Sequence, residues 1–180
     1  MNIKIFTISA ITLAAIAFTA NTQAATASGA ADATVLAPIT IAAADPLSFG
    51  KFVNGASGGT VVVTTAGTRS ATGTVVLSTA GAGWSDGTFT VTGETDATFS
   101  ISIPATVTLE ETGVGTTTMV VTTFSDLTGT TATSTAAGNV TTGTLTAGTQ
   151  TIHVGGELAV GATQVAAPYA GTYDVVVEYN

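Results

Sequence analysis

The chain has 180 residues, of which three are Lys or Arg and eleven are Asp or Glu, so its formal net charge is −8 at pH 7. A surface this acidic repels phosphate backbones and anionic lipid, which argues against nucleic-acid binding and polybasic membrane binding. Cysteine is absent, so the fold must be stabilised by burial and strand pairing alone. Val, Ile and Thr dominate the composition and favour pleated surfaces, which predicts an ordered β protein and excludes a disordered chain.

The first residues have the pattern of a secretory signal peptide. Lys4 is followed by a short apolar run from Ile5 to Ala20 and then by small residues up to Ala24. This pattern is typical of export signals, and the run is short for a membrane anchor, which needs about 20 apolar residues. We predict cleavage after Ala24, with Ala27 as the alternative, and no integral membrane span after cleavage. We therefore expect the protein in the periplasm, at the cell surface or outside the cell.

Residues 25–43 are predicted to form an N-terminal extension or a first strand. Apolar side chains alternate along this stretch at Ala33, Val35, Ala37, Ile39 and Ile41. A period of two places such side chains on one face of a strand, here predicted from Ala33 to Ala43. Pro38 cannot donate to a ladder, so the strand is expected to lie at an edge or to be unpaired on one side there.

Short strands separated by turn residues are predicted along the middle of the chain. They are expected at Leu47–Val53, Val61–Val63, Thr74–Leu77, Phe89–Val91, Phe99–Ile103, Met119–Phe124, Thr144–Leu145, Ile152–Val154 and Leu158–Val160. The turn residues Gly93 to Asp96 predict a hairpin between the strands at Phe89 and Phe99, and Thr128 to Gly138 is predicted to be a surface loop. With the two ends included, about nine or ten short strands predict a single all-β sandwich domain over residues 25–180.

The last ten residues, Gly171 to Asn180, form the clearest strand near either end. Apolar and aromatic side chains alternate there at Tyr173, Val175, Val177 and Tyr179. We predict that this strand is held in a sheet, and that its sequence-distant neighbour is the alternating stretch from Ala33 to Ala43.

Several stretches, taken in this order, carry a resemblance to a known family. They are Ala37–Ile41, Leu47–Gly50, Phe89–Gly93, Phe99–Pro104, Val154–Gly156 and Tyr169–Tyr179. Together they resemble a family of secreted bacterial all-β domains of uncharacterised function, related in style to fimbrial subunits of the chaperone–usher type and to spore-coat-U-like pilins. The resemblance implies an immunoglobulin-like β-sandwich whose missing strand comes from a neighbouring subunit. It implies copies of the chain or related subunits as partners, together with a periplasmic chaperone. A self-complete monomer, with the first strand beside Gly171–Asn180, is the alternative.

The sequence offers little for catalysis or metal binding. His153 is the only histidine, and we interpret it as a polar position on the strand Ile152–Val154, with no acid partner at a recognisable spacing. One His without Cys cannot supply a zinc site, and the acidic residues form no calcium-loop motif. We therefore predict no enzymatic activity, no cofactor and no metal. Trp84 is expected in the core, with an exposed sugar-stacking platform as the alternative.

The expected function follows from export, the two alternating ends and the lack of catalytic groups. We predict an exported, non-enzymatic structural subunit of a surface fibre or coat that assembles by β-strand addition of its N-terminal segment. The residues expected to carry strand addition are Val35, Ile39, Ile41, Tyr173, Val175, Val177 and Tyr179. The alternative is a monomeric secreted binding module for carbohydrate or calcium, with its site in the loops around Trp84 and Asp86.

Overall fold

The computed structural model describes residues 23–81, 83–113 and 115–180. The predicted signal peptide, residues 1–24, lies outside this part of the chain except for its last two residues. The chain divides into two units, Met1–Thr34 and Val35–Asn180. In the first unit, residues 23–34 form neither helix nor strand, and their side chains are exposed. No helix within the described residues has the length and apolar character needed to span a membrane.

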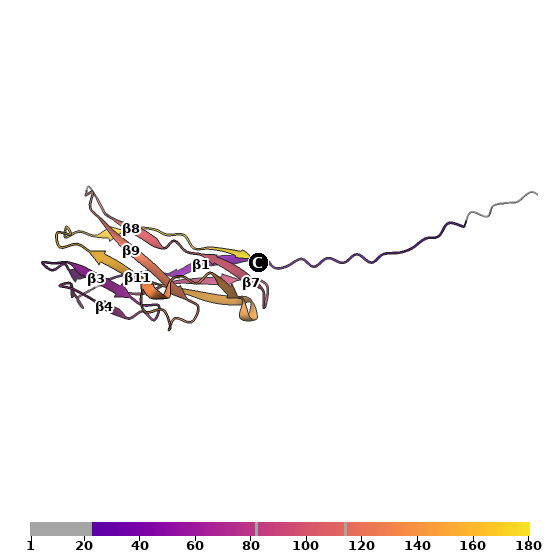
Figure 1. Cartoon of the computed structure of the whole chain (residues 1–180), viewed down its shortest axis with the longest axis horizontal. Helices are drawn as coiled ribbons and strands as arrows, with labels where there is room; N and C mark the ends of the chain where they lie inside the picture. Colours follow the sequence, from indigo (N-terminus) through magenta and orange to yellow (C-terminus); the bar gives the residue numbers. More distant parts are fainter. Residues whose placement is uncertain (1–22, 82, 114) are drawn as a thin grey trace, which may run out of the picture. The chain divides into compact units, whose positions relative to one another are not determined.

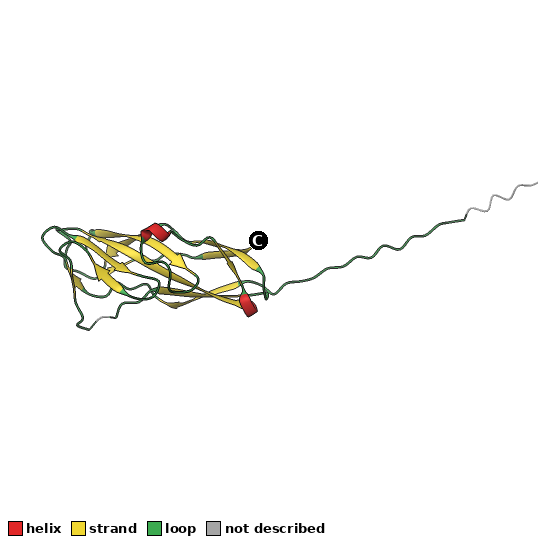
Figure 2. Cartoon of the chain, turned by 60° about the horizontal axis from the view of Figure 1, so that its bottom comes forward, coloured by secondary structure: helices red, strands yellow, loops and turns green. Residues whose placement is uncertain are grey.

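The second unit consists of β-strands and two single-turn helices (Figures 1 and 2). The strands are β1 (Thr40–Asp45), β2 (Phe52–Val53), β3 (Gly59–Val63), β4 (Arg69–Ala71), β5 (Val76–Leu77), β6 (Gly87–Thr92), β7 (Thr98–Ser102), β8 (Thr106–Glu111), β9 (Thr118–Asp126), β10 (Thr142–Thr144), β11 (Thr149–Val160), β12 (Tyr169–Ala170) and β13 (Val176–Tyr179). The 3₁₀ helices are η1 (Thr135–Ala137) and η2 (Thr146–Gly148). The predicted all-β sandwich is confirmed. The described residues form thirteen strands and not nine or ten, because short strands such as β4 and β12 are too short to show a period of two.

The large sheet is built on β11, the longest strand. Its order is β1-β6-β11-β9-β8-β12, and β3 with β4 joins the same sheet beside β11. The first half of β11 pairs with β6, the second half pairs with β3, and β9 pairs along the middle from the other side. The opposite layer has two parts, a three-stranded sheet β10-β7-β13 and a two-stranded ribbon β2-β5.

The two parts of the opposite layer cover two separate hydrophobic cores. The closed half has the three-stranded sheet over a core of Val91, Phe99, Ile101, Leu145, Ile152 and Val154. The open half has the ribbon over a core of Phe49, Val61, Val63, Val75, Val107, Met119, Val121, Leu158 and Val160. Tyr173 packs against both cores, so it marks the boundary between the closed half and the open half.

β11 is continuous where the sequence predicted two short strands separated by Gly155 and Gly156. The structure overturns that prediction, because these glycines are inside the strand and not in a turn. A Cβ on Gly155 would collide with the ring of Phe124, and one on Gly156 would lie 2.7 Å from Cγ1 of Val121. Glycine is therefore required here for close packing against β11.

The predicted hairpin between the strands at Phe89 and Phe99 is also wrong. β6 pairs with β1 and β11, whereas β7 pairs with β10 and β13. The connection crosses between layers, with Asp96 at a φ of 61° and its N–H donating to the carbonyl of Leu145 at 2.8 Å. Crossing lets both strands bury an apolar face in one core, where Val91 and Phe99 are fully buried.

The two ends of the domain lie in different sheets, so their predicted pairing is wrong. β1 pairs with β6, and β13 pairs with β7. β1 begins only at Thr40, because Pro38 has no N–H for a ladder and the residues before it have no strand partner. The ends nevertheless approach each other: Figure 1 places the C-terminus close to β7 and β1, and Ile41 packs against the same core as Val177.

Candidate functional site

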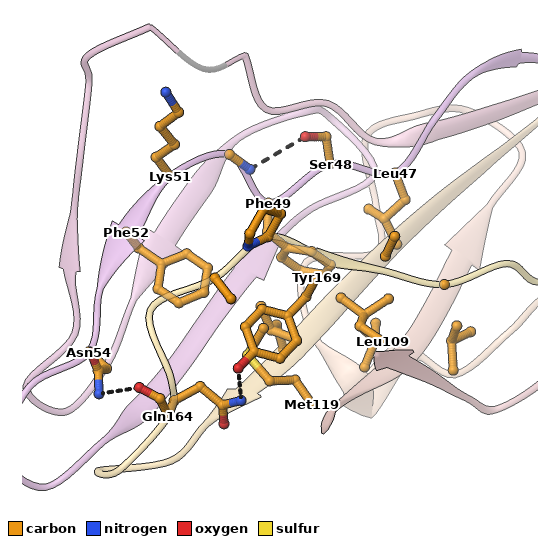
Figure 3. Close-up of a pocket in the computed structure, with 18 of the residues that line it drawn as sticks. Leu47, Ser48, Phe49, Lys51, Phe52, Asn54, Leu109, Met119, Gln164 and Tyr169 are labelled. Atoms are coloured by element: carbon orange, nitrogen blue, oxygen red, sulfur yellow. Dashed lines mark hydrogen bonds between the residues drawn. The ribbon is translucent and has the colours of Figure 1, made fainter. Parts of the chain in front are cut away.

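The main cavity of the described residues is an apolar groove in the open half. Its volume is about 830 Å³. Its floor is made by inward-facing side chains of β8, β9 and β11, and its walls are residues 46–54 and 164–171. Figure 3 shows Phe49, Phe52 and Tyr169 directed toward one another over Leu109 and Met119, while Lys51 points away from them.

The groove lies between two strands that each have one free edge, β12 of the large sheet and β2 of the ribbon. β12 pairs only with β8, and β2 pairs only with β5. Neither strand has a partner on its groove side within the described residues, so the space between the two walls contains no strand. An edge strand without a partner is a ready template for another chain.

Hydrogen bonds close one end of the groove. Nδ2 of Asn54 donates to the carbonyl oxygens of Ala162 at 3.2 Å and Gln164 at 3.1 Å. Nε2 of Gln164 in turn donates to the hydroxyl of Tyr169 at 2.8 Å, as drawn in Figure 3. These contacts hold the two walls at a fixed separation at that end.

Arg69 stabilises the 46–54 wall from β4. Its guanidinium donates to the carbonyl of Phe49 at 2.9 Å and to that of Ser78 at 2.7 Å, and it stacks over the ring of Trp84 at 4.2 Å from the centroid. Trp84 is 39% exposed and belongs to neither core, so its predicted burial is wrong. Because Arg69 covers one face of the ring, only the other face is left for a sugar to stack on.

A second feature, the Ala37 clamp, holds the backbone just before β1. The N–H of Ala37 donates to Oε2 of Glu94 at 3.1 Å, and its carbonyl accepts a hydrogen bond from the hydroxyl of Tyr179 at 2.8 Å. The same hydroxyl accepts the N–H of Glu94 at 2.7 Å. Beyond the clamp, Val35 is 94% exposed and Leu36 is 50% exposed. The clamp therefore marks the point where the chain leaves the domain.

The residues predicted for strand addition fall into two groups. Val35 is exposed, whereas six of them pack, partly buried, against the core of the closed half: Ile39, Ile41, Tyr173, Val175, Val177 and Tyr179. Within that group Tyr173 lies edge-to-face with Phe89, and burial together with the negative charge of Asp86 raises its pKa from 10 to about 12. Apart from Tyr173, the residues that line the groove were missed by the sequence prediction, because nothing in either wall alone indicates the gap between them.

His153 lies on β11, a strand position as predicted, and not in the groove. Its Nδ1 lies 2.9 Å from Oδ2 of Asp86, so an acid partner exists that the sequence spacing did not indicate. The two residues are 67 positions apart, and their contact depends on how β6 and β11 pair. The ring also packs over Gly129, where a Cβ would lie 2.9 Å from Cε1.

Asp126 forms a buried polar centre on the outer side of the large sheet. Its carboxylate accepts hydrogen bonds from the Thr65 hydroxyl at 2.7 Å and from the backbone N–H groups of Gly129, Thr131 and Ala132. Burial alone would raise the pKa of Asp126, but these hydrogen bonds outweigh it and hold the pKa well below its usual range.

The stretch from Thr128 to Gly138, predicted as a surface loop, has a buried residue at Ala132 and contains η1.

Comparison with known families adds the following. The model of a domain of unknown function, DUF4402, matches residues 39–179. The chain belongs to the DUF4402 family. No curated protein and no solved structure matches it. The match begins directly after the Ala37 clamp and Pro38, so the exposed segment lies before the shared domain.

The groove of this DUF4402 domain is lined mainly by apolar side chains. Its lining contains no Asp, Glu, His or Cys, and its only ionisable side chains are those of Lys51, Tyr169 and Tyr173. Within the described residues, no group of three or more His, Cys, Asp or Glu is placed to hold a metal ion. What the groove offers is apolar surface between two unpaired strand edges.

Proposed function

We propose that the protein is an exported, non-enzymatic structural subunit of a surface fibre or coat, and that copies are joined by β-strand addition of the N-terminal segment. The single observation that carries this proposal is the Ala37 clamp with the exposed segment before it. The backbone is held at Ala37 by Glu94 and Tyr179, whereas Val35 exposes 94% of its surface. An exposed β-branched side chain on an unpaired segment gains stability by pairing with another chain.

The composition supports the same proposal. The segment before the clamp, Ala25 to Leu36, contains only one charged residue, Asp32, and no helix-forming pattern. Small and β-branched residues fit an added strand, and the missing disulfide leaves pairing and burial as the means of holding subunits together.

The alternative function, a monomeric binding module for carbohydrate or calcium, has weaker support. Trp84 has one face covered by Arg69. Asp86 is engaged by His153, so this carboxylate is not free to serve as a calcium ligand without losing that contact.

Deletion of residues 25–36 tests the proposal, since it removes the segment and leaves the clamp and β1 intact. We expect the chain from Ala25 to form oligomers or fibres, and the deleted chain to remain folded and monomeric, by light scattering after size exclusion and by negative-stain microscopy. A synthetic peptide of residues 25–37 should bind to the deleted chain.

A matched pair of substitutions separates the segment from general surface effects. Val35→Ser should weaken assembly, whereas Val176→Ser, at a position that is 51% exposed on β13, should not. The proposal is overturned if the chain from Ala25 stays monomeric at every concentration, or if the deleted chain assembles equally well.

A further inference from the structure

We infer that the apolar groove of the open half is the acceptor site for the segment, and that its occupant is Ala33–Leu36 of a second copy lying extended between the two walls. This inference rests on the proposed function and names the surface that the segment enters. The sequence alone had placed strand addition at the two ends of the domain, in the closed half.

The edges of the groove favour a peptide strand over other apolar ligands. β12 on one wall and β2 on the other each have a strand partner on one side only within the described chain. A lipid or an aromatic molecule would fill the apolar floor but would not pair with the free edges of β2 and β12. An extended peptide satisfies both, because strands pair at about 4.8 Å through main-chain hydrogen bonds and bury alternate side chains.

The size and shape of the segment match the groove. Ala33 and Val35 lie on one face of an extended chain, and small or β-branched side chains fit over a floor that already contains Leu109, Met119 and Val121. The volume of about 830 Å³ lies within the range of clefts that enclose a ligand of this size.

Charge favours this acceptor site as well. Lys51 and Arg69 are the only basic residues after Lys4 in an otherwise acidic chain. Lys51 lies on the 46–54 wall, and Arg69 donates to the backbone of the same wall. Asp32 directly precedes the inserted stretch, so its carboxylate is expected to lie nearer to Lys51 on the 46–54 wall than to Glu110 and Glu111 beside β12.

The closed half is a poorer acceptor site. The inward side chains of β13 already pack against its core, and the Tyr179 hydroxyl is already engaged by Ala37 and Glu94 of the same chain. A strand added beside β13 would pair through the backbone but find no unfilled apolar floor there.

Disulfide trapping between copies tests the acceptor site, since the chain contains no Cys and every introduced pair is unique. The test pair is Val35→Cys with Val165→Cys, on the groove wall. The control pair is Val35→Cys with Val120→Cys, on the face of β9 opposite Met119 and Val121. Val165 is 45% exposed and Val120 is 44% exposed, so the two differ in position and not in accessibility.

We expect covalent oligomers of the test pair to exceed those of the control pair by about tenfold or more under mild oxidation, because docking raises the effective concentration of the thiols. Equal trapping of both pairs, preferential trapping of the control pair, or no trapping in a chain that assembles would overturn the groove assignment and leave the proposed function standing. If the chain from Ala25 does not assemble at all, both the proposed function and the groove assignment are overturned.

A plugged groove provides a second, independent measurement. Ala167→Trp places a large side chain on the lining of the groove, and Ala136→Trp places the same side chain on exposed η1. Circular dichroism and Tm should show both variants folded. We expect Ala167→Trp alone to weaken assembly by about tenfold or more, through steric exclusion of the strand. Assembly of a folded Ala167→Trp variant at the level of Ala136→Trp overturns the inference.

Discussion

The closed half and the open half share one large sheet and differ in what lies over it. In the closed half, β10-β7-β13 covers the sheet, and the core residues Val91, Phe99, Leu145, Ile152 and Val154 are fully buried. In the open half, the ribbon β2-β5 covers part of the sheet; Val61 and Val63 are buried as completely, whereas Phe52 and Tyr169 on the walls of the groove are only partly buried. The same sheet therefore carries one core that a three-stranded sheet covers and one core that is partly open to the groove.

This difference separates stability from assembly within one domain. Apolar burial contributes about 25 cal/mol for each Å² removed from water, so a fully buried core side chain in either half contributes more stability than a partly buried side chain on the groove wall. The open half retains apolar surface that can still be buried by another chain. Three measurements probe this contrast, from the largest expected effect to the smallest.

The largest effect is expected from matched truncations in the two halves. Phe99→Ala removes a fully buried ring that packs over Gly143, and we expect a loss of about 3–5 kcal/mol in the free energy of unfolding. Phe52→Ala removes a partly buried ring at the groove wall, and we expect about 1–2 kcal/mol, because less surface is re-exposed.

Urea denaturation of the chain from Ala25, at a concentration where it is monomeric, measures both losses. Phe99→Leu serves as the conservative control and should lie between the unmodified chain and Phe99→Ala. Equal losses for Phe99→Ala and Phe52→Ala would remove the distinction between the two halves.

A second measurement concerns the sheet that the halves share. Asp126→Asn keeps the shape of the side chain and removes the charge that its hydrogen-bond donors stabilise. We expect a loss of about 2–4 kcal/mol at pH 7, since hydrogen bonds to a buried charge are strong. Because Asp126 lies on β9, which pairs with β11, hydrogen exchange should show reduced protection in both halves.

The pH dependence of the same carboxylate has a definite sign. The pKa of Asp126 is depressed in the folded state, so its contribution is fully present above the unfolded value, about 3.9, and is lost as the pH falls through the folded value. The stability difference between the unmodified chain and Asp126→Asn should therefore shrink as the pH is lowered below about 4. A constant difference down to the acid limit would contradict the assigned role of the hydrogen bonds.

The sequence predicted those features that depend on local pattern. Alternating apolar residues and glycine-rich turns were sufficient for an all-β sandwich. The alternation from Tyr173 to Tyr179 did indicate a final strand, but that strand is Val176–Tyr179 and not the whole predicted stretch from Gly171 to Asn180. Pairing was not predictable in this way. The strands at Phe89 and Phe99 have the pattern of a hairpin, yet they lie in opposite layers, because a period of two shows that one face is buried and not which layer buries it.

The groove could not be predicted for the same reason. Its walls are far apart in sequence, since Asn54 and Gln164 are separated by 110 positions, and no residue pattern in either wall indicates the gap between them. Gly155 and Gly156 led to the prediction of a turn that does not exist, because glycine commonly marks a turn. Here the two glycines let Phe124 and Val121 pack closely against a continuous strand.

The smallest effect compares one hydroxyl in each half. Tyr179→Phe removes the group that joins Ala37 to Glu94 in the clamp, and Tyr169→Phe removes the group that contacts Gln164 and Val165 at the groove wall. Each substitution should lower the free energy of unfolding by about 0.5–1.5 kcal/mol, the net value of a typical hydrogen bond.

The two substitutions should differ in which backbone amides exchange faster. Tyr179→Phe should speed amide exchange at Ala37 and Glu94, and Tyr169→Phe should loosen the 164–171 wall without affecting the clamp. Faster exchange at the clamp in both variants would mean that the two halves respond as one cooperative unit, and the contrast between them would then describe their packing but not their stability.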